Sequence, residues 1–295
     1  MMRRRSLLGT GAALLAATPA VLGRRAAAQA GAKKIKIGWT AWSDAEAVTK
    51  LVAKLLKERM GHEVELVMAD IGLQYQGLVS GDLDVMLMSW QPLTHGAYLE
   101  RVGKEVDDLG PIYTMARLGW VVPTYVPESE LSSIEDLAKP AVAEKLGGKV
   151  QGIDPGAGLM QASEKAIKDY GLKYELVSAS DAGMLAAVER AERRKEWIVA
   201  TSWSPHWMFS RWQLRYLKDP KGALGGLETV NAVGRKGFYQ DLPEAYAFLS
   251  RFNIELADLE SIMFAAQSSS VEQAVDDFVA KNPKLVDYWV SGKAA

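Results

Sequence analysis

Apolar strand-like runs alternate with segments of helical periodicity from Lys33 onward, and this alternation restricts the fold more than any other feature of the sequence. The first series comprises a strand over 34–38, a helix over 45–60, a strand over 64–68, a short helix over 71–80 and a strand over 83–88. Crossovers in such a βαβαβ unit are right-handed, so its strands should lie parallel and end at one edge of the sheet. The pattern therefore predicts an α/β fold with a ligand site at that edge.

A second series of the same kind follows an extended stretch over 113–126 and a helix start that Ser132 and Ser133 can cap. It predicts strands over 149–153, 174–178 and 197–202, helices over 159–170 and 181–194, a return strand over 229–233 and four amphipathic helices over 242–290. The four helices should close over the first lobe. We expect one lobe from 31–118 together with 228–295, a second lobe from 119–227, and the site in the cleft between them.

Composition limits the kinds of partner. A chain of 295 residues with 48% hydrophobic content is long enough for two lobes, and its net charge of -1 gives no support for nucleic-acid binding. The absence of cysteine excludes disulfides, thiolate metal sites and cysteine nucleophiles. The three histidines, His62, His95 and His206, form no His-x-x-x-His pair. We therefore expect no metal and no cofactor, and we place His62 at the surface after the helix-ending Gly61.

The N-terminus has the features of an export signal. Arg3, Arg4 and Arg5 precede an apolar stretch over 7–22, and small residues over 26–30 offer cleavage sites. The paired arginines resemble a twin-arginine signal, and an uncleaved anchor is the alternative. We expect a signal peptide over 1–30, cleavage near residue 30 and a periplasmic protein.

Three tryptophans stand close to the ends of predicted strands. Trp90 follows the apolar run over 83–88, Trp203 follows the run over 197–200, and Trp42 follows the first strand. A tryptophan beside a strand end is by default a packing residue. Tryptophan faces also attract cations, and a quaternary ammonium suits an aromatic box because it has no N–H groups that would go unbonded. We interpret Trp42, Trp90 and Trp203 as such a box.

The opposite end of the predicted site suits an anion. The segment over 152–158 is a strand followed by a glycine-rich turn into a helix, so the N–H groups of Gly158 and Leu159 can face a negative group. His95 can add a ring N–H. A cation at one end and a carboxylate at the other describe a betaine. The turn also contains part of a dinucleotide fingerprint, but Gln161 occupies the position of its third glycine, which argues against a nucleotide.

Several multi-residue motifs resemble the glycine betaine/proline betaine family of substrate-binding proteins of ABC importers. They are Trp90-Gln91-Pro92-Leu93-Thr94-His95, Gly152-Ile153-Asp154-Pro155-Gly156-Ala157-Gly158, Ser202-Trp203-Ser204-Pro205-His206-Trp207-Met208-Phe209 and Leu217-Lys218-Asp219-Pro220-Lys221-Gly222. The resemblance covers nearly the whole chain after the signal. It implies a type II-like periplasmic-binding-protein fold and a non-catalytic monomer that delivers its ligand to a permease in the inner membrane.

The resemblance also assigns roles to residues. It implies that the ammonium group lies in a cage of Trp42, Trp90 and Trp203, and that the carboxylate meets His95 and the amides of Gly158 and Leu159. Glycine betaine, proline betaine, choline and carnitine share the cationic end, so a choline- or carnitine-specific binder is the nearest alternative. His95 favours a carboxylate over choline. Osmoprotection and catabolism both remain open as the role of the cargo.

Two further classes of protein are alternatives to a binding protein. Ser204 and His206 suggest a hydrolase of trimethylammonium compounds, but no Gly-x-Ser-x-Gly elbow is present, so the hydrolase is disfavoured. A ligand-sensing module of a signalling protein has no output region to support it. We expect His206 to be a structural hydrogen-bonding histidine. Asp44 can meet the cation or cap the helix that begins near Ala45, and the cap is favoured.

Overall fold

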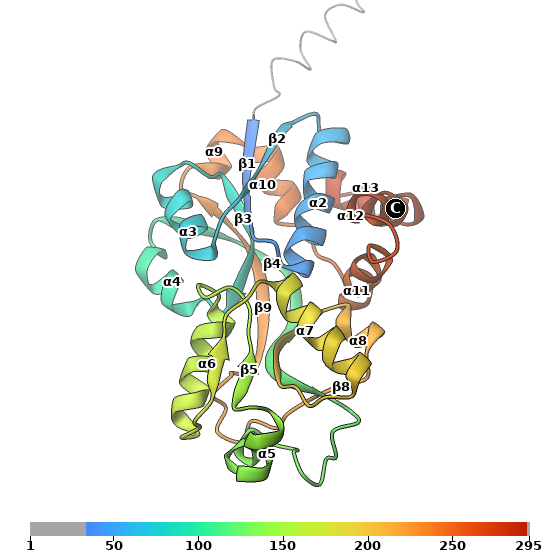
Figure 1. Ribbon diagram of the computed structural model, residues 1–295. Coiled ribbons are helices and arrows are strands. Elements are labelled where there is room, and N and C mark those ends of the chain that lie inside the picture. The colour runs from blue at the N-terminus through green and yellow to red at the C-terminus, as the bar shows by residue number, and fades with distance from the viewer. Residues whose placement is uncertain (1–33, 294–295) are drawn as a thin grey trace, which may run out of the picture. The chain divides into compact units, whose positions relative to one another are not determined.

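Both predicted series of strands lie in one mixed sheet in the computed structural model, which describes residues 34–293 (Figure 1). The strands are β1 (Lys34–Trp39), β2 (Glu63–Met68), β3 (Val85–Gln91), β4 (Val106–Pro123), β5 (Lys149–Gln151), β6 (Glu175–Val177), β7 (Ala200–Ser204), β8 (Leu214–Tyr216) and β9 (Leu227–Arg235). Their order is β2-β1-β3-β9-β4-β7-β5-β6, with β8 also paired to β4. The predicted signal peptide lies outside the described residues.

Helices occupy most of the connections between the strands. The first seven are α2 (Ser43–Glu58), α3 (Ile71–Ser80), α4 (Gly96–Val102), α5 (Pro140–Lys145), α6 (Gly158–Asp169), α7 (Asp181–Arg194) and α8 (Met208–Arg211). The last five are α9 (Phe238–Asp241), α10 (Pro243–Leu249), α11 (Leu256–Ala265), α12 (Val271–Lys281) and α13 (Pro283–Ser291). A short 3-10 helix spans Ile134–Ala138, and the side chain of the preceding Ser133 caps it. Among the described residues, no helix has the length and apolar character that a membrane span requires.

The first lobe is built around β1, β2 and β3. These strands are parallel, as the βαβαβ pattern predicts, because α2 and α3 provide the two crossovers. Ile35 and Ile37 are fully buried, and β3 is buried along almost its whole length because helices cover both faces of the sheet here. The helices predicted over 242–290 are confirmed as α10 to α13, and α11 and α12 pack against α2.

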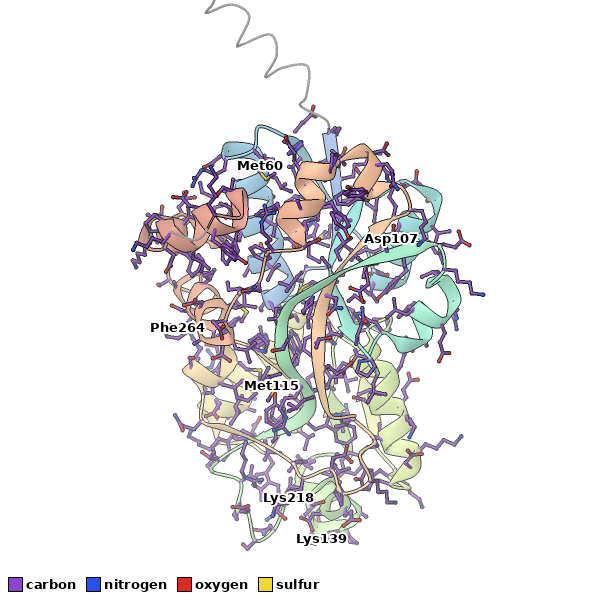
Figure 2. All side chains as sticks on the ribbon, turned by 180° about the vertical axis from the view of Figure 1, so that it is seen from behind. Met60, Asp107, Met115, Lys139, Lys218 and Phe264 are labelled. Carbon is purple, nitrogen blue, oxygen red and sulfur yellow. The ribbon has the colours of Figure 1, made fainter. Side chains whose placement is uncertain are left out.

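Two long strands connect the halves of the sheet. β9 runs antiparallel to both β3 and β4, and Figure 2 shows β4 and β9 side by side along the back of the molecule. Their pairing is irregular between Tyr113 and Ala116, where Met115 has a positive φ of 62°. A bulge of this kind bends a strand and redirects its two ends. The return strand predicted over 229–233 therefore corresponds to the middle of the longer strand β9, which connects the two halves of the sheet.

The second lobe is built around β5, β6 and β7, with α6 and α7 as crossovers (Figure 1). β7, the strand before Trp203, is parallel to β5, as predicted, and also pairs antiparallel with β4. A separate apolar cluster, which extends in sequence from Trp120 to Leu224, occupies part of this lobe, whereas Met184, Val188 and Ala200 belong to the larger cluster that includes the first lobe. The lobe boundaries at residues 118 and 228 stay a prediction.

His62 is buried, so its predicted surface position is wrong. It is only 8% exposed, and neither ring nitrogen has a hydrogen-bond partner among the described residues. Gly61, with a φ of 76°, ends the helical path, and the N–H of His62 donates to the carbonyl of Leu56. This Schellman-type turn folds the next residue back toward the apolar side of the helix, which explains the burial.

Candidate ligand-binding cavity

One cavity brings together all six residues that the sequence predicted for the site. It encloses about 300 Å³ of space, part of it open to solvent. The six are Trp42, Trp90, His95, Gly158, Leu159 and Trp203. Asp44, Thr94, Leu118, Ile153 and Ala157 complete the lining.

The cage tryptophans (Trp42, Trp90 and Trp203) reach the cavity from three different strand ends. Trp42 directly precedes α2, Trp90 is the next-to-last residue of β3, and Trp203 is the next-to-last residue of β7. Their exposed fractions are 6%, 3% and 3%. The apolar runs bury these strands in the core, and their ends lie at the cleft. A large aromatic residue at the end of each strand therefore lines the cleft.

Carboxylates on the opposite lobe fix the orientation of two cage rings. The indole N–H of Trp42 donates to Asp154 Oδ2 at 2.9 Å, and that of Trp203 donates to Asp44 Oδ1 at 3.0 Å. Trp90 packs edge-on against Tyr113, with ring centroids 6.3 Å apart. Since each carboxylate faces a ring from the other lobe, these bonds join the two lobes across the cavity.

Asp44 does not cap α2, so the favoured sequence interpretation is wrong. The helix begins at Ser43, one residue before Asp44, so this carboxylate turns inward. Asp44 is 1% exposed and accepts hydrogen bonds from Trp203 and from Tyr113 Oη, the latter at 2.6 Å. Burial raises the pKa of Asp44, although the bond from Tyr113 opposes that shift. Both direct donors are neutral, and no lysine or arginine in the described range forms an ion pair with Asp44. A buried carboxylate without a counter-ion favours a cation in the cavity.

The start of α6 forms the other end of the cavity. The N–H groups of Gly158 and Leu159, the first two residues of this helix, have no hydrogen-bond acceptor among residues 34–293. Helix N-termini carry such unpaired amides together with the positive end of the helix dipole. This end of the cavity therefore favours an anion.

His95 is neutral and has a fixed tautomer. It is 1% exposed, and burial lowers its pKa to about 3, although a backbone hydrogen bond to Met88 opposes this shift. Its Nδ1 accepts the backbone N–H of Trp90 at 3.1 Å, so the ring proton lies on Nε2. Glu228 holds the preceding loop by accepting the backbone N–H groups of Leu93 and Thr94 at 3.0 and 2.9 Å. The histidine can therefore donate a hydrogen bond without carrying a charge.

The lobes meet closely beside the cavity. A Cβ atom on Gly158 would lie 2.2 Å from the carbonyl oxygen of Thr94, so only glycine permits this approach. Tyr98 Oη donates to the carbonyl of Gly156 at 2.9 Å and so connects α4 to the loop before α6. These contacts define a closed arrangement around the cage.

The alternative catalytic groups do not form an active site. Ser204 Oγ bonds with Tyr216 Oη at 2.9 Å, and His206 bonds with Asp181 at 3.3 Å, so the two are not paired with each other. His206 is a buried structural residue outside the cavity lining, as predicted. The described part of the chain contains no group of three or more His, Cys, Asp or Glu side chains placed to bind a metal.

The residues of the site region that were not predicted include Tyr113, Asp154, Asp181 and Glu228. Asp154 belongs to the glycine-rich motif, so its place beside Gly158 was visible in the sequence. The other three lie far along the chain from their partners, and no local pattern marks them.

The family model described as the substrate binding domain of ABC-type glycine betaine transport system matches residues 33–281. The glycine betaine/carnitine transport binding protein GbuC of Listeria monocytogenes is 34% identical over 185 residues, which are 61% of this chain and 58% of that protein. The match thus spans less than two thirds of this relative. The glycine betaine/proline betaine-binding periplasmic protein of Salmonella typhimurium is 22% identical over 280 residues, with 82% of this chain and 84% of that protein covered.

Two solved structures resemble this one closely. Lactococcal OpuAC, in its closed-liganded conformation with glycine betaine, is 36% identical, covers 88% of this chain and 100% of its own, and has a TM-score of 0.82. A choline-binding protein of an ABC transporter in complex with choline is 26% identical, covers 88% of this chain and 92% of its own, and has a TM-score of 0.81. The predicted two-lobed α/β fold is therefore confirmed.

Proposed function

This chain belongs to the family of substrate-binding domains of ABC-type glycine betaine transport systems, and we propose that its cavity captures glycine betaine or a closely related quaternary ammonium zwitterion for delivery to an importer's permease. Proteins of this family bind substrates for transport and are not enzymes, so the hydrolase alternative is set aside.

The main support for the proposal is that one end of the cavity favours a cation and the other end favours an anion. The cage tryptophans and Asp44 favour a cation, whereas His95 and the free amides of α6 favour an anion. A zwitterion satisfies both ends at once. A desolvated cation–π contact is worth about 2 kcal/mol, so three such contacts give about 6 kcal/mol, and micromolar affinity needs about 8. Hydrogen bonds to the carboxylate supply the remainder, at about 1.5 to 3 kcal/mol each.

Choline is the second candidate ligand, and Asp44 is the observation that favours it. A buried carboxylate without a counter-ion attracts a ligand of net positive charge more strongly than a zwitterion. Choline cannot accept from His95 as a carboxylate does, however, and it would leave the amides of Gly158 and Leu159 less well paired. We therefore rank glycine betaine first, with proline betaine and carnitine as further carboxylate ligands.

We also place the protein in the periplasm, after cleavage of the signal peptide near residue 30. The arginine-led apolar segment at the N-terminus supports export, and the Salmonella relative is a periplasmic protein. The permease partner would be an inner-membrane protein, and the importer's role is osmoprotective or catabolic uptake.

Calorimetry tests the proposal directly. The protein is titrated with glycine betaine, proline betaine, carnitine and choline, and glycine serves as a control that keeps the carboxylate but lacks the methylated ammonium. We expect saturable binding of the betaines, weaker binding of choline and no binding of glycine, together with a change in tryptophan fluorescence. Absence of binding to every quaternary ammonium compound would refute the function.

A further inference from the structure

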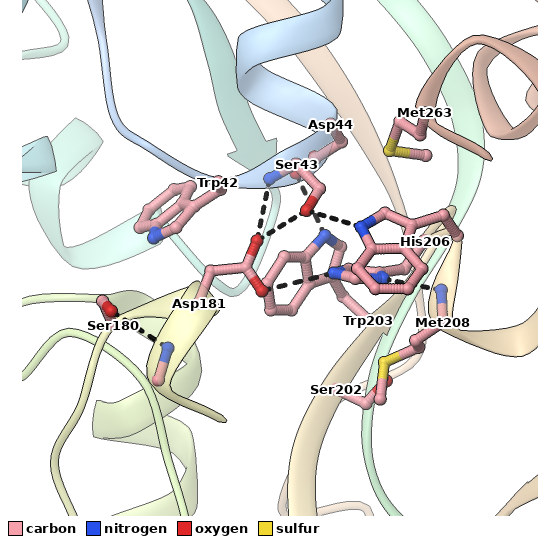
Figure 3. A network of polar contacts seen from close by, with 12 residues as sticks. Trp42, Ser43, Asp44, Ser180, Asp181, Ser202, Trp203, His206, Met208 and Met263 are labelled. Carbon is pink, nitrogen blue, oxygen red and sulfur yellow. Dashed lines mark hydrogen bonds and ion pairs between the residues drawn. The ribbon is translucent and has the colours of Figure 1, made fainter. Parts of the chain in front are cut away.

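A single buried carboxylate, that of Asp181, joins the starts of two helices from opposite lobes. Its Oδ2 accepts from the backbone N–H of Ser43 at 2.9 Å and from Ser43 Oγ at 2.7 Å, although the two residues are 138 positions apart. Ser43 is the first residue of α2, and Asp181 is the first residue of α7 (Figure 3). Asp181 is 3% exposed and does not line the cavity.

The first turn of α2 depends on this contact. Trp42, the residue that precedes the helix, gives it no side-chain cap. Asp181 fills that role from the other lobe, since its carboxylate accepts one of the amides that a helix start leaves unpaired. The positive ends of both helix dipoles favour the same negative charge. The start of α7 has its own cap, because Ser180 Oγ accepts the N–H of Gly183 at 3.1 Å.

His206 and Trp207 make further hydrogen bonds that hold Asp181 and Ser43 in place. His206, which is fully buried, lies with Nε2 3.3 Å from Asp181 Oδ1. Its Nδ1 accepts the backbone N–H of Met208 at 3.0 Å, so the N–H of Nε2 faces Asp181. Trp207 donates its indole N–H to Ser43 Oγ at 3.2 Å. All four groups are therefore satisfied within one network.

The network borders the cage without entering it. Ser43 lies between the cage residue Trp42 and Asp44, which holds Trp203. His206 packs edge-on against Trp203, with ring centroids 4.7 Å apart. Since α2 and α7 belong to different lobes, a movement that separates the lobes would break the contact between Ser43 and Asp181. Its loss on opening exposes both groups to water, which replaces the hydrogen bonds.

On this basis, and resting on the proposed function, we propose that Asp181 is a positioning residue that stabilises the closed form through Ser43 and so sets the rate of ligand release without selecting among ligands. Apparent affinity scales with the population of the binding-competent form, so the loss of this contact weakens every ligand by one common factor. Cage residues, in contrast, contact different ligands differently.

The test compares Asp181→Ala with Ser180→Ala, which removes the cap of α7 and leaves the link between the lobes in place. Stopped-flow tryptophan fluorescence gives association and dissociation rates for glycine betaine and choline. We expect Asp181→Ala to raise dissociation tenfold or more for both ligands, with association changed less than threefold and the ratio of the two affinities within twofold of wild type. Ser180→Ala should leave dissociation within threefold.

Ser43→Ala provides a second variant that keeps the helix intact. It should raise dissociation by a smaller factor. In the Asp181→Ala background it should add less than it does alone, because the bond to Asp181 is already lost and only the bond from Trp207 remains to be removed. Unchanged dissociation in Asp181→Ala, equal effects of Asp181→Ala and Ser180→Ala, or a shifted affinity ratio would each overturn the role of Asp181. Failure of wild type to bind any quaternary ammonium compound would instead refute the proposed function.

Discussion

Trp203 donates its indole N–H to Asp44 at 3.0 Å, although the two residues are 159 positions apart in the chain. One residue ends a strand of the second lobe, and the other lies in the first turn of a helix of the first lobe. Their bond orients a cage ring and, at the same time, places a buried negative charge beside it. The pair therefore links the geometry of the cage to the cation binding that we propose for it.

Substitution of Trp90 tests whether the cage tryptophans bind the ligand's cation through their π faces. Its indole N–H makes no hydrogen bond among the described residues, so substitution changes mainly the ring. Trp90→Leu should cost about 2 kcal/mol of binding free energy, near thirtyfold in affinity for glycine betaine, whereas Trp90→Phe should cost clearly less. Trp203→Leu should cost at least as much, because it also removes the bond to Asp44. Calorimetry on variants shown by circular dichroism to be folded checks this. Equal losses for Phe and Leu would contradict a cation cage.

His95→Ala should discriminate between ligands. A hydrogen bond to a charged group is worth about 1.5 to 3 kcal/mol, so glycine betaine should bind roughly tenfold more weakly or worse. Choline lacks a carboxylate, and its affinity should change little. The two dissociation constants are measured for wild type and variant. A proportional loss for both ligands would mean that His95 only shapes its loop.

Asp44→Asn should show the opposite preference. Asparagine keeps the shape and an acceptor for Trp203 but removes the negative charge that faces the cation. Choline, a net cation, should lose affinity tenfold or more, which corresponds to about 1.4 kcal/mol or more of binding free energy. Glycine betaine should lose less, because its carboxylate is no longer repelled. Comparable losses for both ligands would argue that Asp44 acts only by positioning Trp203.

Gly158→Ala should prevent closure. The added methyl group would lie 2.2 Å from the backbone carbonyl oxygen of Thr94, so the loop of Thr94 and the start of α6, which belong to different lobes, would have to move apart. Affinity for every ligand should fall more than tenfold, while the melting temperature without ligand stays near that of wild type. Gly156→Ala is the matched control, since a Cβ there meets nothing within 4 Å. Tight closure would be disproved if both variants bound like wild type.

The buried neutral His95 should make stability depend on pH. Its pKa is lowered to about 3, whereas in the unfolded chain it lies near 6.5. Between these values the unfolded chain binds a proton that the folded protein does not, so stability is complete above pH 6.5 and falls as the pH falls. The expected contribution is about 1.4 kcal/mol for each pH unit. Urea unfolding of the ligand-free protein at several pH values between 6.5 and 4.5 measures the slope. His95→Gln should flatten it, and an unchanged slope would exclude His95 as its source.

The sequence by itself predicted most of the longer elements and six residues that line one cavity, but not β8 or the short helices α4, α5 and α8. Helix α7 occupies the predicted range of 181–194, and the parallel first series follows its hydrophobic period. The tryptophans near strand ends and the glycine-rich start of α6 could be predicted because each depends on a run of adjacent residues. Periodicity and capping are local effects, so a single sequence displays them directly.

Only the tertiary structure decided which charged groups complete the site. From the sequence, Asp44 could equally have capped a helix. Because α2 begins one residue earlier, at Ser43, the Asp44 carboxylate faces the interior instead. Asp181 meets Ser43 across 138 positions, and His62 is covered by a turn whose path depends on a single glycine. Hydrogen bonds between distant segments depend on how the lobes pack against each other. The packing energy is spread over many weak contacts, which produce no periodic pattern in the sequence.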